Sequence, residues 1–142
     1  MKSERIVVRD RVRWSDVDKM NVMLFANYLR FVEIAETEFF RALGYSYDEI
    51  AEQLGVWIAR IHVEMDFRFP ARLDDELTAY AEVRKVGGSS MYFSFPIERA
   101  SDGKRLCDVQ FVLACLDRET LRTARIPEPL ASALRSQLVS AA

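Results

Sequence analysis

Residues 15–28, SDVDKMNVMLFANY, contain two aspartates followed by a run of mostly apolar residues. Asp16 and Asp18 stand two residues apart, and Asp18 is followed by Met20, Val22 and further apolar side chains. A carboxylate among apolar neighbours is poorly hydrated, which suits it to accept a proton near neutral pH. Asp18 is therefore a candidate base, although its residue type alone favours a turn or helix N-cap aspartate.

The other reactive side chains fit structural roles. His62, the only histidine, lies in the strand-like segment ARIHVEMDF and is interpreted as a sheet residue. Cys107 and Cys115 lie in an apolar run without a CxxC partner, so we expect reduced core residues. Glu33 falls on a predicted helix as a second candidate carboxylate or an ion-paired surface residue. No His, Cys and Asp cluster has metal-ligand spacing, so no metal is expected.

Composition narrows the class of protein. The chain has 142 residues, 50% of them hydrophobic and 30% charged, and a formal net charge of −2. That length suits one domain, residues 1–142, whose core needs no disulfide or metal. The small net charge gives no sign of nucleic-acid binding. We expect no membrane span and a cytoplasmic location, because no window holds about 18 uncharged apolar residues and the N-terminus has no secretory h-region.

Hydrophobic periodicity predicts a strand followed by two helices. Residues 4–14 alternate as in a strand, with Trp14 on the inward parity. Residues 26–43 carry apolar side chains at helical spacing, and Gly44 follows as a C-cap. The segment SYDEIAEQLG begins with a capping box, which predicts a short second helix.

After Gly55 the pattern changes to that of β-strands. Segments rich in β-branched and aromatic residues are separated by the turn-like stretches PARLDDE, GGSS and SDGK. The four strands predicted here cover residues 56–69, 76–86, 90–99 and 105–117. The fold is then α+β, a five-stranded antiparallel sheet with the long helix on one face. One helix covers one face only, so we expect a second subunit to cover the remainder.

The order of these elements resembles the hotdog fold, in which an antiparallel sheet wraps around a long central helix. The closer resemblance is to the 4-hydroxybenzoyl-CoA thioesterase and YbgC-like acyl-CoA thioesterase family. Its members carry a D-x-D motif near the end of the first strand and an Asn-Tyr or similar pair at the central helix. Asp16-Val17-Asp18 and Asn27-Tyr28 match these motifs. The segments LRFVEIAETEFFRALG, PARLDDEL and RIP also look like the family's helix and connections.

The chain departs from the family pattern in the turn before the helix. Asn21 stands where the family commonly has glycine, and asparagine also tolerates left-handed backbone angles. Residues 23–25, Met-Leu-Phe, replace a stretch that often contains His or Asn. A mechanism that needs a histidine in this turn is excluded, which disfavours a dehydratase of the same fold.

The resemblance implies an acyl-CoA thioesterase. Asp18 would be the general base or the nucleophile, and the backbone N–H of Phe25, at the start of the central helix, would stabilise the oxyanion. Asn27 would contact the substrate or hold the Asp18 loop, and a helix N-cap role is equally open. Tyr28 is a candidate for either the core or the acyl pocket. The other residues expected in that pocket are Met20, Met23 and Leu24.

The CoA portion of such a substrate carries phosphates, which require basic contacts. The GGSS segment is interpreted as a hairpin turn. In this fold the turn often lies near CoA, so Ser89 and Ser90 are candidate contacts. The basic candidates, each also an ordinary surface residue, are Arg84, Lys85, Arg122 and Arg125. No cofactor is implied beyond the CoA of the substrate.

Two alternative functions share this fold. One is a thioesterase acting on an acyl carrier protein, and the other is a non-catalytic acyl-thioester or lipid-binding module. The resemblance implies a homodimer or homotetramer with sites across the subunit interface. The residues do not indicate the acyl chain length or an aromatic against aliphatic preference, and they do not decide between the nucleophile and base roles of Asp18.

Overall fold

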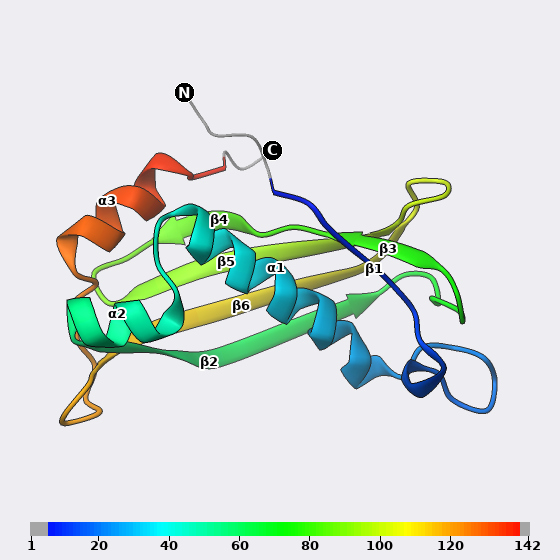
Figure 1. The fold of residues 1–142 in the computed structure, drawn as a ribbon, viewed down its shortest axis with the longest axis horizontal. Helices are drawn as coiled ribbons and strands as arrows, with labels where there is room; N and C mark the ends of the chain where they lie inside the picture. The colour runs from blue at the N-terminus through cyan, green and yellow to red at the C-terminus, as the bar shows by residue number, and fades with distance from the viewer. Residues whose placement is uncertain (1–5, 140–142) are drawn as a thin grey trace.

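A curved antiparallel sheet wraps around one long helix in the computed structural model, which describes residues 6–139 (Figure 1). The helix is α1 (Tyr28–Ala42). The strands are β1 (Val8–Arg11), β2 (Val56–Phe67), β3 (Glu76–Ala79), β4 (Glu82–Val86), β5 (Ser90–Arg99) and β6 (Arg105–Asp117). Their order is β1-β3-β5-β6-β2, with β4 also paired to β5. Every pair is antiparallel, as the sequence predicted.

The sheet has six strands where the sequence predicted five. Residues 76–86 form β3 and β4 instead of one strand, and the two lie end to end along β5. Pairing with β3 stops at Ile97 of β5, and pairing with β4 resumes at Ser94. Pro96 lies between these two positions, and its nitrogen has no hydrogen to donate to a ladder. The break between β3 and β4 therefore coincides with a residue of β5 that lacks a backbone N–H.

The first strand is shorter than predicted. β1 ends at Arg11, and a 3-10 turn, η1 (Trp14–Asp16), then redirects the chain. Trp14 was expected on the inward parity but is 84% exposed, because the alternation of a strand does not continue through a 3-10 turn. Val12, two residues before Trp14 and of the same parity, is buried. Residues 4 and 5 of the predicted strand lie outside the described residues.

The helices begin and end at residues suited to those positions. A 3-10 turn, η2 (Phe25–Asn27), precedes α1, and Gly44 follows it with a φ of +102°, a conformation that favours glycine. The predicted capping box starts α2 (Tyr47–Leu54). Ser46 Oγ accepts the Glu49 N–H at 3.1 Å, and the Glu49 carboxylate accepts the Ser46 N–H at 3.2 Å.

A third helix, α3 (Glu128–Ser136), was not predicted from the sequence. Leu130, Ala131 and Leu134 are buried on it, at the spacing of one helical face. Pro129 lies in its first turn, a position that suits proline. Both signals are present in the sequence, but nine residues are too few for the periodicity to stand out.

α1 is anchored on the sheet by aromatic side chains. The Phe93 ring on β5 lies 5.2 Å from that of Phe39 and 5.9 Å from that of Phe40, measured between ring centroids. On the same strand, Phe95 stacks on Phe93 at 5.9 Å. Phe40, Phe93 and Phe95 are fully buried, so these edge and stacking contacts add to a large burial of apolar surface.

Several titratable groups are buried within this core. Glu36 of α1 accepts hydrogen bonds from Tyr47 Oη and Arg60 Nη2, each at 2.6 Å, which links α1 to α2 and β2. Burial raises the pKa of Glu36 in spite of these two donors. Cys107 and Cys115 are buried and unpaired, as predicted, and burial raises the pKa of the Cys115 thiol to about 11.

Phe93→Ala should lower the free energy of unfolding by about 3–5 kcal/mol, because it removes a buried ring and leaves a cavity between helix and sheet. Urea unfolding followed by circular dichroism measures this change. Leu121→Ala, at an exposed turn residue, is the control and should change the value by less than about 0.5 kcal/mol. Equal effects of the two substitutions would contradict the packing described for Phe93.

Candidate active site

The chain between β1 and α1 reverses direction in a tight loop. Val17 and Met23 pair across its base, and inside it the Asp18 N–H donates to the Val22 carbonyl at 2.9 Å. Asn21 has a φ of +58°, which confirms the prediction of a turn residue that tolerates left-handed angles. Its Oδ1 also accepts the Leu73 N–H at 3.1 Å, so the loop is fastened to the chain before β3.

The Asp18 side chain uses its two oxygens differently. Oδ1 accepts the N–H groups of Met20 at 2.8 Å and Val22 at 3.3 Å, as in an Asx turn. Oδ2 has no hydrogen-bond donor among residues 6–139. The side chain is half-buried. The geometry therefore fits the turn interpretation through one oxygen and leaves the other able to accept a proton.

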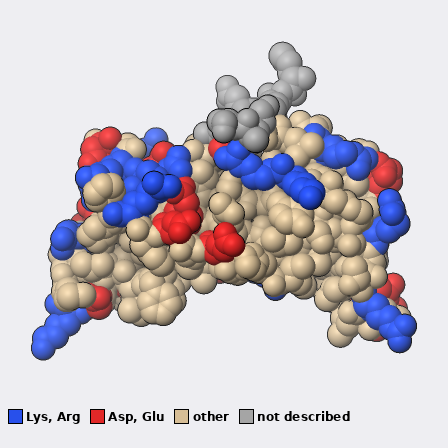
Figure 2. Space-filling view, turned by 180° about the vertical axis from the view of Figure 1, so that it is seen from behind, with Lys and Arg blue, Asp and Glu red and all other residues tan. Residues whose placement is uncertain are grey.

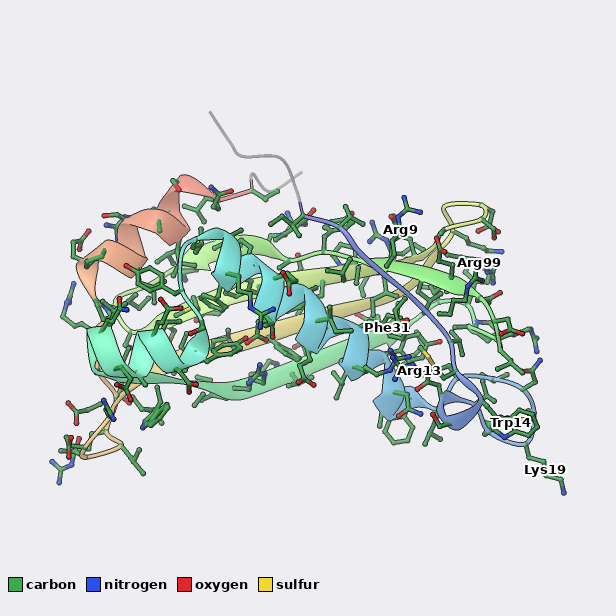
Figure 3. All side chains as sticks on the ribbon, in the orientation of Figure 1. Arg9, Arg13, Trp14, Lys19, Phe31 and Arg99 are labelled. Carbon is green, nitrogen blue, oxygen red and sulfur yellow. The ribbon has the colours of Figure 1, made fainter. Side chains whose placement is uncertain are left out.

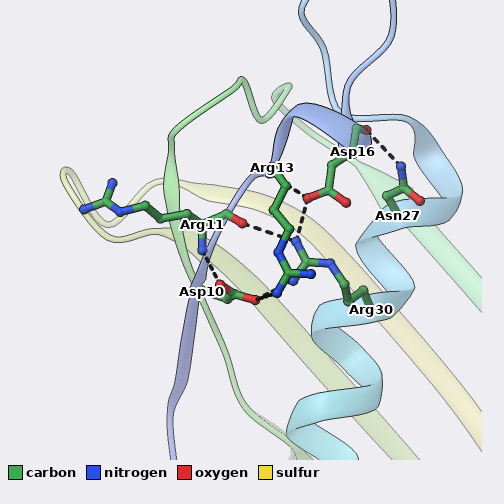
Figure 4. Close-up of polar contacts among 6 residues, drawn as sticks. All are labelled: Asp10, Arg11, Arg13, Asp16, Asn27 and Arg30. Carbon is green, nitrogen blue, oxygen red and sulfur yellow. Dashed lines mark hydrogen bonds and ion pairs between the residues drawn. The ribbon is translucent and has the colours of Figure 1, made fainter.

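Asp16, the first aspartate of the motif, is a structural residue in this arrangement. It is 5% exposed, and its Oδ2 accepts the Arg13 N–H at 2.7 Å and Arg30 Nη2 at 2.5 Å. Its backbone oxygen accepts the Leu24 N–H at 2.8 Å and Asn27 Nδ2 at 2.9 Å (Figure 4). Asn27 occupies the expected N-cap position of α1, but its side chain makes no cap hydrogen bond there, and its contact with Asp16 supports the role of holding the Asp18 loop.

Arg30 is a residue that sequence reasoning missed. From the first turn of α1 it donates to Asp10 Oδ2 and Asp16 Oδ2, each at 2.5 Å, and to the Arg11 carbonyl at 3.2 Å (Figure 4). Burial alone would lower the pKa of Arg30, but the two carboxylates raise it. The signal available in the sequence was a basic residue three positions after Asn27, which could have been paired with the acidic D-x-D motif.

The predicted oxyanion donor lies just before the central helix. Phe25 begins η2, so its N–H belongs to this 3-10 turn and not to the first turn of α1. The N–H has no acceptor among residues 6–139, as expected for the first amide of a helical segment. The Phe25 side chain is 65% exposed. Its role as the oxyanion donor stays a prediction.

A small apolar pocket lies between this turn and the end of β2. Its volume is about 330 Å³, and its lining consists of Val22, Met23, Phe25, Tyr28, Phe67, Arg68, Phe69 and Pro70. The backbone N–H of Val22, a lining residue, also donates to Asp18 Oδ1, whereas Asp18 itself does not belong to the lining. Sequence reasoning missed the aromatic residues at the end of β2, because only the fold brings them next to residues 22–28.

The acyl-pocket predictions divide between this pocket and the surface. Met23 and Tyr28 line the pocket. Tyr28 is also a core residue, since its hydroxyl accepts the Ala71 N–H at 3.2 Å and its ring meets the edge of Phe67 at 5.4 Å. Met20 is 73% exposed and Leu24 is exposed, and neither belongs to the lining within one chain. The pocket predictions for these two residues find no support in the single chain.

A larger hollow of about 760 Å³ lies across β2, β4, β5 and β6. It is lined largely by charged residues, including Arg68, Arg105 and Asp108, which are paired with one another. Figure 2, seen from behind, shows acidic and basic side chains side by side on that view of the molecule. We favour the smaller pocket as the acyl site, because the larger hollow offers paired charges and does not include the Asp18 loop.

The predicted CoA contacts lie at the other end of the sheet from the Asp18 loop. The loop, with Lys19 at its tip, is at the right in Figures 1 and 3, whereas the β4–β5 turn lies at the left beside α2 and α3. Ser89 and Ser90 belong to that turn, and the Ser89 carbonyl accepts the Cys115 N–H at 2.9 Å. One chain therefore does not bring these residues to Asp18.

The four basic candidates at that end differ in their contacts. Arg84 donates to Glu82 and Ser94, and Lys85 Nζ lies 5.2 Å from the centre of the Tyr92 ring. Arg125 approaches Gly88 beside the β4–β5 turn, and Arg122 is exposed in the turn after β6. Contact with CoA stays a prediction for all four.

Among residues 6–139, no group of three or more His, Cys, Asp or Glu side chains could hold a metal ion. None of the helices in that part of the chain has the length and apolar character needed to cross a membrane. The cytoplasmic location stays a prediction from the sequence.

Comparison with known proteins identifies the family. Residues 12–134 match the model of the thioesterase-like superfamily. Because this match spans most of the sequence, the chain belongs to that superfamily. The D-x-D loop, the long central helix and strands β2 to β6 lie within the matched residues, and β1 lies just before them. The hotdog fold predicted from the sequence is thereby confirmed.

Individual relatives agree with this assignment. The chain is 29% identical to the acyl-CoA thioester hydrolase YbgC of Escherichia coli O6:H1 over 121 residues, 84% of this chain and 88% of the relative. The hypothetical protein TT1821 of Thermus thermophilus has 28% identity and a TM-score of 0.83, covering 94% of this chain and 99% of that one. SAV2348 of Staphylococcus aureus, solved in complex with CoA, shares the fold at 16% identity, with a TM-score of 0.88 over 100% of this chain and 90% of its own.

Asn21 variants test the geometry of the loop. Asn21→Gly keeps the left-handed backbone accessible and loses only the side-chain bond to Leu73. Asn21→Ala loses the same bond and adds a backbone cost of about 1 kcal/mol. We expect the Ala variant to unfold at a lower urea concentration than the Gly variant. If both variants unfolded at the same midpoint, the left-handed conformation of Asn21 would be wrong.

Proposed function

We propose that the protein is an acyl-CoA thioester hydrolase in which Asp18 is the reactive carboxylate. The observation that carries this proposal is the hydrogen bonding of Asp18, whose Oδ1 is held by two loop amides while Oδ2 has no donor among residues 6–139. One of those amides belongs to Val22, which lines the apolar pocket. Membership of the thioesterase-like superfamily supports the reaction class, and the name of the Escherichia coli relative supports a CoA thioester as the substrate.

The proposed reaction begins with the acyl group in the pocket between residues 22–28 and the end of β2. Asp18 Oδ2 accepts a proton from a water molecule as the water oxygen attacks the thioester carbon. The carbonyl oxygen gains negative charge and accepts a hydrogen bond from the Phe25 N–H. When the C–S bond breaks, the carboxylic acid forms and the proton held by Asp18 passes to the CoA thiolate. In the nucleophile variant, Asp18 Oδ2 itself attacks the thioester carbon, the C–S bond breaks and the CoA thiolate leaves. Water then cleaves the resulting anhydride to the carboxylic acid and the Asp18 carboxylate, and the proton released from the water passes to the thiolate.

Asp18→Asn should reduce kcat for acyl-CoA hydrolysis by at least about 100-fold, because the amide cannot accept the proton or act as the nucleophile. A panel of acyl-CoAs from short to long chain, with one aromatic member, provides the substrates, and release of the CoA thiol is the readout. Asp48→Asn, an exposed aspartate in the first turn of α2, is the matched control.

Two outcomes would contradict the proposal. Full activity of Asp18→Asn would remove Asp18 from the chemistry. If the wild type hydrolysed no member of the panel, the non-catalytic binding module would be favoured. Matched acyl-carrier substrates belong in the same experiment, and a large preference for them would replace CoA by a carrier protein.

We further propose that the site is completed by a second copy of this chain along β2. β2 is the last strand of the sheet order, and it carries exposed apolar residues, among them Ile61 at 60%, Val63 at 44% and Phe67 at 51%. An apolar edge strand of this length is normally covered. In Figure 2 the lower edge between the two projecting ends is largely uncharged, which suits such a contact.

Two-fold pairing of β2 with itself would also join the two halves of the site. The strand runs from the end near α2 to the end near the Asp18 loop (Figure 1). In an antiparallel pair, each loop end therefore lies beside the other copy's α2 end. A pair centred on Val63 would set His62 of one copy opposite Glu64 of the other, so no like charges would face each other there. The predicted CoA contacts would then serve the Asp18 of the opposite subunit.

Val63→Lys should convert the proposed dimer to a monomer, because it places a charge at the centre of the apolar edge. Sedimentation velocity at equal protein concentrations measures the assembly, and thioester hydrolysis should fall together with it. Leu121→Lys, at an exposed apolar residue in the turn after β6, is the control and should leave both unchanged. A wild-type monomer, or a Val63→Lys variant that sediments like wild type, would rule out this interface.

A further inference from the structure

Arg30 links three segments that meet at the start of α1. We propose that Arg30 is a positioning residue for hydrolysis, which holds Asp16 and, through Asp16, the loop that presents Asp18. This inference rests on the proposed function of Asp18. Arg30 does not line the apolar pocket, so its effect is assigned to the geometry of the loop and not to contact with the acyl group.

The guanidinium of Arg30 is fixed on several sides. Nη1 donates to Asp10 Oδ2 and Nη2 donates to Asp16 Oδ2, both at 2.5 Å. Nη2 also reaches the Arg11 carbonyl at 3.2 Å, and the guanidinium carbon lies 4.4 Å from the centre of the Phe31 ring. A planar fork that satisfies two carboxylates at once holds one orientation, which a lysine ammonium cannot reproduce.

Asp16 transmits this constraint to both arms of the Asp18 loop. Its neighbour Val17 pairs with Met23 at the base of the loop. Its backbone oxygen binds the Leu24 N–H on the returning arm. Displacement of Asp16 would therefore move both arms, and with them the direction in which the unpartnered oxygen of Asp18 points.

Asp16 is only 5% exposed, so water cannot replace the hydrogen bond that its carboxylate accepts from Arg30. Without Arg30, the one donor left to this carboxylate among residues 6–139 is the Arg13 N–H, and a buried carboxylate with one neutral donor is costly to keep in place. Asp10 cannot replace Arg30 as a partner of Asp16, since a carboxylate has no hydrogen to donate to another carboxylate. We expect loss of Arg30 to release Asp16 toward solvent and to loosen the Asp18 loop while the helix–sheet core remains.

The test compares Arg30→Ala and Arg30→Lys with Arg41→Ala, which removes an exposed arginine from the same helix. We expect Arg30→Ala to lower kcat by about 10- to 100-fold with KM changed less than about threefold, since a displacement near 1 Å costs about that much. Arg30→Lys should retain part of the activity, and Arg41→Ala all of it. Guanidinium chloride at low concentration should restore kcat of Arg30→Ala saturably, whereas sodium chloride should not.

A double variant separates action through Asp18 from a general structural effect. If Arg30 acts by positioning Asp18, Arg30→Ala should cause no further loss in the Asp18→Asn background. A full additional loss there, or an Arg30→Ala variant with wild-type kcat, would overturn the inference. If Arg30→Ala does not fold, Asp16→Asn takes its place in the same cycle. An Asp18→Asn variant as active as wild type would overturn the proposed function itself, so the two failures are distinguishable.

Discussion

The structure depends on one constraint, that a single helix must cover the inner face of a long curved sheet. α1 meets this requirement through aromatic contacts with β5, in which Phe93 touches both Phe39 and Phe40. Because these contacts fix the position of the helix, they also fix where it begins. The chain that leaves β1 must turn back to reach that point, and the Asp18 loop is this return. The edge strand β2 lies at the end of the sheet order with exposed apolar side chains, since one helix cannot cover it as well.

Most of the fold could be predicted from hydrophobic periodicity. Each wrong prediction can be traced to a particular residue or turn. β5 and β6 have the bounds expected from the sequence, because their alternation and flanking turns are clear. The break between β3 and β4 was missed because Pro96, with which it coincides, lies in the neighbouring strand and not in residues 76–86. Trp14 was misplaced because alternation alone does not show where a strand gives way to a 3-10 turn.

The candidate site could be predicted only in part, because residue type carries no information on distance between segments. The D-x-D motif located the loop, and Asn21 was recognised as its turn residue. Arg30 and Phe67 were missed, since their importance comes from contacts with Asp16 and Tyr28 that only the folded chain creates. The predicted CoA contacts were chosen by charge and by resemblance, and they lie at the opposite end of the sheet. A site that joins both ends requires a second chain.

The two interpretations of Asp18, a turn aspartate and a reactive carboxylate, are not exclusive in this geometry. The N–H groups of Met20 and Val22 hold Oδ1 and so fix the rotation of the carboxylate. Once that rotation is fixed, Oδ2 has a set direction without a donor of its own among residues 6–139. A fixed rotation helps a general base, because the oxygen that accepts the proton is already oriented and no entropy is lost in orienting it during the reaction. The same hydrogen bonds that make Asp18 a good turn residue would therefore also prepare it for the role that we propose in thioester hydrolysis.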